Sequence, residues 1–166
     1  MSLLNVILTK INPLILCLAF KNLYFYNQIE IKKSSLNSFC NYSESLLSAS
    51  EYNNLNPFLL ASLIYQETRW TTNLKSHKGA CGLTQVIPFY VGQTCDYLIN
   101  FPEFAIEAGA YVLNIYNHYS DFNIEKALQC YASGYKCNHP SYSNDIIQNT
   151  YLLETSYFEL ENELNE

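Results

Sequence analysis

Apolar side chains recur at helical spacing along most of the chain. Phe39, Tyr42 and Leu46 are three and four positions apart, with Leu47 beside them, which predicts a helix over residues 38–50. No segment shows the sustained alternation of apolar and polar residues that is typical of a strand. The sequence therefore predicts a mainly α fold with many short helices.

A second helix is predicted to begin at Asn56-Pro57, because asparagine caps open backbone N–H groups and proline in the first turn has no N–H to lose. Three apolar side chains mark its buried face, namely Leu60, Leu63 and Ile64. Glu67 follows them by seven, four and three positions. A carboxylate therefore falls on the apolar face near the end of this helix.

A third helix is predicted over residues 102–118, with Pro102 in its first turn. It is apolar nearly all round, so it should be central and buried. Gly109 in its middle costs about 1 kcal/mol relative to alanine. A close helix–helix approach would explain this glycine.

The remaining loops and helices are predicted from residues that cap helices or interrupt them. Residues 71–83 are polar and contain two glycines, which predicts a loop. Asn123 can cap a further helix that Gly134 ends. A last helix is predicted over residues 141–160.

The first twenty residues are apolar but are interrupted by Lys10, Asn12 and Pro13, whereas a spanning helix needs about 20 uninterrupted apolar residues. The run 11–20 resembles the hydrophobic region of a signal peptide, although no A-x-A cleavage site follows it. We predict an export or membrane-association segment in residues 1–20; the alternative is an ordinary buried helix. Residues 1–35 are assigned to this segment and its connector, and residues 36–166 to a single domain.

Composition narrows the class of partner. Hydrophobic residues make up 49% of the chain, which is too many for a disordered protein, and 166 residues suit one core. The net charge is −6 and the isoelectric point is about 5.0, so nucleic acid is a poor partner. Fifteen tyrosines and nine phenylalanines can fill a core or line a groove that grips sugars.

Six cysteines, an even number, indicate disulfides and an oxidising compartment, with buried free thiols as the alternative. Cys130, Cys137 and His139 lie close together in the sequence, but no fourth metal ligand is nearby. Neither a metal nor a cofactor is predicted.

Glu67 is the candidate catalytic residue. Burial disfavours the charged carboxylate and raises its pKa, and a carboxylic acid that is protonated near neutral pH can donate a proton to a glycosidic oxygen. The alternative is that Glu67 pairs with Arg69 or Lys75 at the end of its helix.

The neighbouring motifs favour catalysis. In order, the chain carries Gln66-Glu67-Thr68, the run from Ser76 to Pro88 that includes Gly79-Ala80-Cys81-Gly82-Leu83-Thr84-Gln85, then Tyr131-Ala132-Ser133-Gly134, and Tyr142 four residues before Ile146. Over roughly residues 38–155 these motifs resemble the soluble lytic transglycosylase family of the lysozyme-like superfamily, which also contains goose-type lysozyme. The family pattern is Glu-Ser, Ser-x-x-Gly-Ala-x-Gly-Leu-Met-Gln-x-x-Pro, Ala-Tyr-Asn-x-Gly and Tyr-Val-x-x-Val.

The resemblance implies a single lysozyme-like helical domain that cleaves the β-1,4 bond between N-acetylmuramic acid and N-acetylglucosamine in peptidoglycan. Glu67 would protonate the glycosidic oxygen and then accept the proton of the muramoyl 6-hydroxyl, giving a 1,6-anhydro product. A hydrolytic muramidase of goose-type character is the alternative. A further alternative is a catalytically silent glycan-binding protein of a virion or secretion machine.

Substrate contacts implied by the resemblance fall on Thr68, Gly79, Ala80, Gly82, Gln85, Tyr131 and Tyr142. Thr68 stands in place of the family's serine, and its hydroxyl can bond either the substrate or the loop. Thr84 replaces a methionine, which should change a pocket wall, and Ala132 replaces an asparagine.

Two cysteines lie inside family motifs and two follow them, which predicts the pairs Cys130–Cys137 and Cys81–Cys95. The expected partner is the peptidoglycan glycan strand, in the periplasm or another extracytoplasmic compartment, or else on a virion. Association with a membrane, or with secretion, conjugation or phage machinery, is left open.

Overall fold

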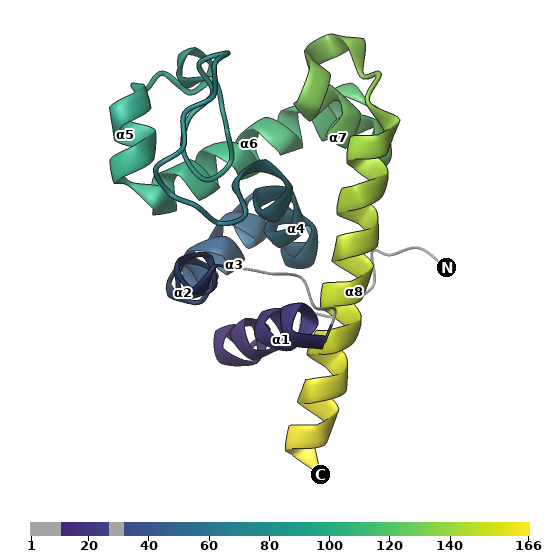
Figure 1. The fold of residues 1–166 in the computed structure, drawn as a ribbon. Helices are drawn as coiled ribbons and strands as arrows, with labels where there is room; N and C mark the ends of the chain where they lie inside the picture. The colour runs from purple at the N-terminus through teal and green to yellow at the C-terminus, as the bar shows by residue number, and fades with distance from the viewer. Residues whose placement is uncertain (1–10, 27–31) are drawn as a thin grey trace.

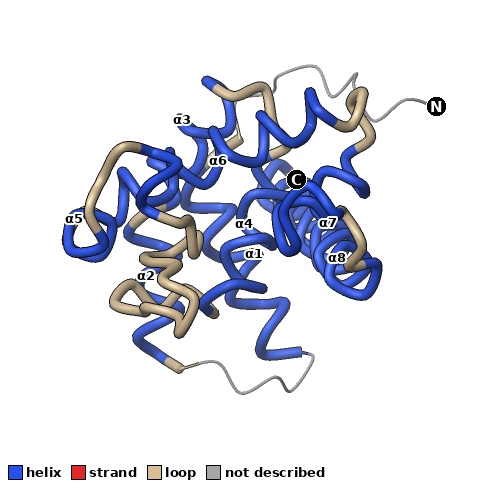
Figure 2. Tube along the Cα trace, turned by 90° about the horizontal axis from the view of Figure 1, so that it is seen from above, coloured by secondary structure: helices blue, strands red, loops and turns tan. Residues whose placement is uncertain are grey.

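The computed structural model describes residues 11–26 and 32–166, and within these ranges it is helical, without a strand (Figure 2). The elements are α1 (Pro13–Tyr26), α2 (Lys33–Asn41), α3 (Ser43–Tyr52), α4 (Pro57–Thr68), η1 (Pro88–Val91), α5 (Cys95–Asn100), α6 (Pro102–Tyr119), α7 (Ile124–Ser133), η2 (Gly134–Lys136) and α8 (Pro140–Asn165). The prediction of a mainly α, single-domain fold is confirmed.

Helix α4 lies at the centre of the molecule (Figure 1). The Asn56 side chain accepts hydrogen bonds from the backbone N–H groups of Phe58 and Leu59, and Pro57 occupies the first turn, as the cap predicted. Nearly all of α4 is buried, from Phe58 to Tyr65 and again at Thr68. The long helix α8 packs along α4 and α1, and α6 joins the α5 end of the molecule to the α7 end (Figure 1).

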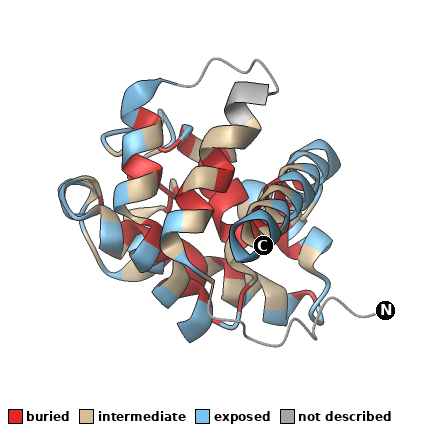
Figure 3. Cartoon of the chain, turned by 90° about the horizontal axis from the view of Figure 1, so that it is seen from below, coloured by how far each residue is buried: buried red, intermediate tan, exposed pale blue. Residues whose placement is uncertain are grey.

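Aromatic side chains pack α1 against α2 and Trp70. Phe20 of α1 stacks on Phe39 of α2 with 3.9 Å between ring centroids, and Trp70 meets the edge of Phe39 at 4.8 Å. A disulfide joins Cys17 to Cys40. Figure 3 shows the buried residues gathered where the helices meet, while the last turns of α8 are exposed.

Helix α1 covers the second half of the apolar segment 1–20 and behaves as the buried helix that was the alternative there. The domain boundary at residue 35 stays a prediction; α1, which precedes it, packs against α8. Residues 1–10 lie outside the described part of the chain, so the export or membrane-association role stays a prediction. Among the described helices none has the length and hydropathy to cross a membrane.

Several boundaries differ from the predictions. The helix expected over 38–50 is two helices that meet at Tyr42, because this residue leaves the helical region with φ −108° and ψ 11°. Residues 95–100, for which no element was predicted, form the short helix α5, which Thr94 caps. Helix α8 continues past residue 160 to Asn165.

Candidate active site

Glu67 lies in the last turn of α4, and Tyr142 in the first turn of α8 contacts its carboxyl group. The helix ends directly after it, since Arg69 and Trp70 both adopt left-handed backbone conformations with φ of 52° and 60°. The residue is half-buried. The chain thus presents one carboxyl group at the point where the central helix meets the loop.

The carboxyl group of Glu67 is held by Tyr142, whose hydroxyl donates a hydrogen bond to Oε1. Burial raises the pKa of Glu67 to about 7, and the hydrogen bond from Tyr142 partly offsets that rise. Near neutral pH the group therefore populates both its protonated and its ionised form. This is the condition under which one carboxyl group can donate a proton and later take one back.

Tyr131 completes a cluster with Glu67 and Tyr142. Its hydroxyl donates to the carbonyl oxygen of Thr84 at 2.7 Å, so α7 is tied to the loop. Burial, followed by the charge of Glu67, holds the pKa of both tyrosines well above the usual value. Both hydroxyls are therefore protonated at neutral pH and act as hydrogen-bond donors.

Thr68 fixes the loop to the helix. Its buried hydroxyl contacts the carbonyl oxygens of Ile64 at 3.1 Å and Leu83 at 2.9 Å. Of the two roles expected for this hydroxyl, a bond to the substrate or to the loop, the structure shows the bond to the loop.

The loop between α4 and η1, residues 71–87, is held in shape by hydrogen bonds within it. Ser76 and Ala80 bond each other twice, through the Ser76 N–H to the Ala80 carbonyl at 2.8 Å and through the Ala80 N–H to the Ser76 hydroxyl at 3.0 Å. The side-chain amide of Gln85 donates to the Gly82 carbonyl at 2.9 Å and to the Leu74 carbonyl at 3.2 Å. Gln85 therefore anchors the loop through its amide nitrogen.

Gly82 is required where it stands. It has φ of +74°, and a Cβ atom there would lie 2.6 Å from the carbonyl oxygen of Leu98. Gly79 has φ of +84° but open space around it, so its requirement is conformational only. Gly79 and Ala80 are both half-buried at the surface of the loop.

Thr84 is fully buried, which corrects the expectation that it forms a pocket wall. Its hydroxyl donates to the carbonyl oxygen of Ala105 at 2.6 Å. A Cβ atom on Gly109 would lie 2.4 Å from the Thr84 side chain. The close approach inferred at Gly109 is therefore between α6 and the loop, and not between two helices.

Disulfides brace both sides of the site. They join Cys81 to Cys95 and Cys130 to Cys137, the two pairs expected from the sequence. Cys81 lies in the loop, and Cys130 directly precedes Tyr131. Because the sulfur atoms of Cys130 and Cys137 are bonded to each other, these residues do not offer thiolates to the metal site considered with His139.

No second carboxylate contributes to the pKa of Glu67 within the described part of the chain. Glu107 of α6 is exposed, as are Asp121 and Glu125. Glu103 is also exposed, and its charge acts on Tyr42 of the α2–α3 corner. Glu67 is thus the carboxyl group around which the described site is organised.

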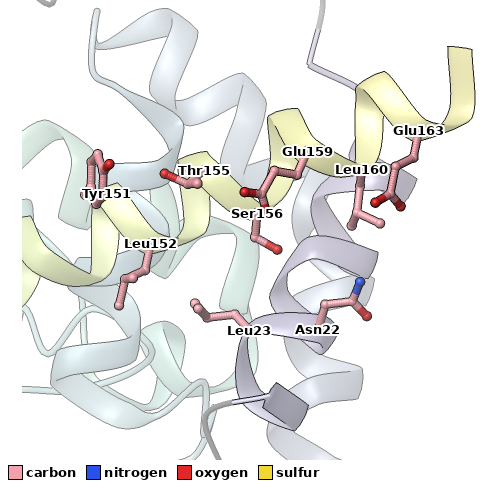
Figure 4. A pocket seen from close by; sticks show the side chains of 9 residues that line it. All are labelled: Asn22, Leu23, Tyr151, Leu152, Thr155, Ser156, Glu159, Leu160 and Glu163. Atoms are coloured by element: carbon pink, nitrogen blue, oxygen red, sulfur yellow. The ribbon is translucent and has the colours of Figure 1, made fainter. Parts of the chain in front are cut away.

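Two grooves lie away from the Glu67 cluster. One of about 430 Å³ runs between α1 and the second half of α8, lined by residues such as Leu23, Leu152, Glu159 and Glu163 (Figure 4). Another, of about 320 Å³, lies between α4 and α8 and includes Gln66 and Asp145. Neither is lined by Glu67, Tyr131 or Tyr142.

Comparison with known proteins agrees with the motifs. None of the curated proteins matches the chain in sequence. The profile of the family described as "Transglycosylase SLT domain" matches residues 44–152, which contain α4, the loop, α7 and the first half of α8. The match covers well over half of the chain and every member of the Glu67 cluster. Proteins with this domain act on peptidoglycan. The chain therefore belongs to the transglycosylase SLT family of the lysozyme-like superfamily.

Proposed function

We propose that this protein is a peptidoglycan lytic transglycosylase with Glu67 as its catalytic acid and base. The observation that carries the proposal is the environment of Glu67. Burial raises its pKa to about 7 while the Tyr142 hydroxyl holds the carboxyl group in one orientation. A group that is half protonated near neutral pH can serve in both directions of proton transfer.

In the first step, the protonated Glu67 gives its proton to the oxygen between N-acetylmuramic acid and N-acetylglucosamine as the bond from that oxygen to the anomeric carbon breaks. The 6-hydroxyl of the same muramoyl residue then bonds to the anomeric carbon. Its proton passes to the Glu67 carboxylate, which restores the starting acid. The products are a free 4-hydroxyl on N-acetylglucosamine and a 1,6-anhydromuramoyl end, and no water is consumed.

The surrounding residues supply position and hydrogen bonds. Tyr142 orients the carboxyl group, and Tyr131 keeps the loop at a fixed distance through the Thr84 carbonyl. Gly79 and Ala80 place backbone at the loop surface where a sugar can approach. The carbonyl oxygen of the Gln85 amide can accept from a sugar hydroxyl, because the hydrogen bonds to Gly82 and Leu74 use the amide nitrogen. Thr68 acts indirectly, by holding the loop.

Intramolecular closure is favoured over hydrolysis because hydrolysis by this route requires a base for water or a second carboxylate nucleophile. In retaining enzymes the two carboxyl groups lie about 5 Å apart. Among the described residues, the acidic side chains outside α4 that were candidates for this role are exposed and do not act on Glu67.

The three disulfides support action outside the cytoplasm, where disulfides persist. The proposed substrate is the glycan strand of the wall.

The test is digestion of purified sacculi followed by mass spectrometry of the released muropeptides, before and after borohydride treatment. We expect products that are one water lighter than a reducing end and that borohydride leaves unchanged. Products that borohydride reduces would replace the proposal with a hydrolytic muramidase. Absence of any release would favour a silent glycan-binding protein.

A further inference from the structure

Tyrosine rings continue from the Glu67 cluster across the end of α6. Tyr131, next to Glu67, is within electrostatic reach of Tyr116 on α6. Burial raises the pKa of Tyr116, and the charges that Tyr135 of η2 and Tyr90 of η1 carry when ionised raise it further. Tyr116 therefore lies between two surface segments. We define the aromatic track as Phe89, Tyr90, Tyr116, Tyr119 and Tyr135.

The rings of the track hold one another in place. The ring centroids of Tyr135 and Tyr116 are 5.5 Å apart with an interplanar angle of 68°, and those of Tyr135 and Tyr119 are 4.9 Å apart at 74°. On η1, Phe89 and Tyr90 make the same edge-to-face contact at 5.8 Å. Such pairs are stabilised by about 0.5–1.5 kcal/mol beyond the area that they bury. The track is thus ordered without being buried.

Four members of the track are exposed to solvent, to 85% for Phe89, 67% for Tyr90, 66% for Tyr135 and 53% for Tyr119. Single exposed aromatic side chains are ordinary, but a connected group at the surface is typical of a binding site. The pKa of Tyr131 in the Glu67 cluster responds to the charge of Tyr116, which indicates that the group lies near that cluster.

The backbone that carries Tyr135 is restrained independently of the rings. Tyr135 is the middle residue of η2, and the disulfide between Cys130 and Cys137 encloses that segment. Gly134, with φ of 65°, makes the turn into it. A ring that is fixed in advance loses little conformational entropy when a ligand binds.

We propose that the aromatic track binds the glycan strand beyond the bond that is cleaved, by stacking tyrosine faces on the apolar faces of N-acetyl sugar rings. Tyrosine combines a flat apolar face with a hydroxyl, and a pyranose ring likewise has an apolar face of C–H groups and hydroxyls at its edge. None of the five members carries a formal charge at neutral pH, which suits the neutral face of an N-acetyl sugar ring. The inference rests on the proposed function, and it makes a long glycan strand, rather than a short fragment, the preferred substrate.

The test uses the inactive Glu67→Gln protein, so that glycan is bound but not cleaved, and peptide-free glycan strands as tetrasaccharides and octasaccharides. Calorimetry on the Tyr135→Ala variant should show octasaccharide binding weaker by about 10-fold, which corresponds to ~1.4 kcal/mol, with a smaller loss for the tetrasaccharide. Tyr135→Phe keeps the ring face and should bind within about twofold of the parent. Tyr52→Ala removes a ring that is 83% exposed at the end of α3, away from the track, and serves as the matched control.

Circular dichroism and melting temperature show whether each variant is folded, and Tyr119→Ala tests the same surface from α6. Equal losses for both strand lengths, or equal losses in Tyr135→Phe and Tyr135→Ala, would overturn the role of the ring faces. Unchanged octasaccharide binding in both alanine variants would overturn the track. If the parent protein binds neither strand, the proposed function fails as well, and that result is distinct from the others.

Discussion

Two regions of this molecule place glutamates between helices, and they differ in what surrounds the carboxyl group. At the α4–α8 junction, Glu67 is half-buried, hydrogen-bonded to Tyr142, and has a pKa that burial raises to about 7. In the α1–α8 groove, Glu159 and Glu163 line a space of about 430 Å³ but are exposed (Figure 4). The comparison teaches that a carboxyl group becomes chemically useful through desolvation and a fixed partner.

The three disulfides also differ between these two regions. Cys17–Cys40 joins α1 to α2 in the groove half of the molecule and closes a sequence separation of 23. Cys81–Cys95 and Cys130–Cys137 are local to the site, with separations of 14 and 7. The first restrains a large part of the unfolded chain, and the other two position segments next to Glu67.

The largest expected effect separates the two kinds of glutamate. Glu67→Gln should lower peptidoglycan cleavage by about 10³-fold, because the amide can neither donate nor accept the catalytic proton while it keeps the shape of the carboxyl group. Glu159→Gln makes the same chemical change in the groove and should leave the rate unchanged. Release of soluble muropeptides from sacculi measures both rates, and near-wild-type release by Glu67→Gln would remove the assignment.

The pH dependence of stability in Glu67→Gln gives a second test of the comparison. The pKa of Glu67 rises from 4.5 in the unfolded chain to about 7 in the folded protein, so the folded state binds the proton more tightly. Stability from this group is fully present below pH 4.5 and is lost as the pH rises through about 7, by up to about 3 kcal/mol. Glu67→Gln should therefore gain stability over the wild type at pH 8 but not at pH 4.

Urea unfolding at several pH values measures this difference. A gain for Glu67→Gln that does not depend on pH would show that burial of the charge is not its cause.

Removing disulfides should separate stability from activity. Replacing Cys17 and Cys40 with serine should lower the free energy of unfolding by about 3 kcal/mol, because a long loop is released in the unfolded chain, with little change in cleavage by the folded protein. Replacing Cys130 and Cys137 should cost less stability, about 2 kcal/mol, and lower cleavage more, because Tyr131 adjoins Cys130. Denaturant curves and initial rates below the unfolding transition give both quantities. The opposite ranking in activity would contradict the division.

The smallest expected effect concerns Tyr142. Tyr142→Phe removes the hydrogen bond that lowers the pKa of Glu67, so that pKa should rise further. Because the proposed reaction starts from protonated Glu67, the alkaline limb of the pH–rate profile should move to higher pH while the maximal rate falls by about 10-fold. Tyr151→Phe, an exposed tyrosine that lines the α1–α8 groove, is the control. A shift of the limb to lower pH would refute the role given to this hydrogen bond.

Local sequence signals determined much of the fold. Asn56 and Pro57 specified the start of α4, the spacing of Leu60, Leu63 and Ile64 specified its buried face, and the position of Glu67 on that face followed from helical geometry alone. The end of α7 at Gly134 was specified in the same way. These features depend on hydrogen bonds and contacts within a few residues, so a periodic pattern is enough to predict them.

Only the tertiary structure decided which distant groups meet Glu67 and how each polar side chain is used. Tyr142 is 75 residues away from Glu67 in the sequence, and Tyr131 reaches Thr84 across 47. Thr84 was expected at a pocket wall and is buried, because α6 approaches the loop closely at Gly109. The apolar run that suggested export includes a helix whose buried face packs in the core, since hydrophobicity alone does not tell a membrane from a protein interior. Such contacts arise from packing between elements, which no local pattern encodes.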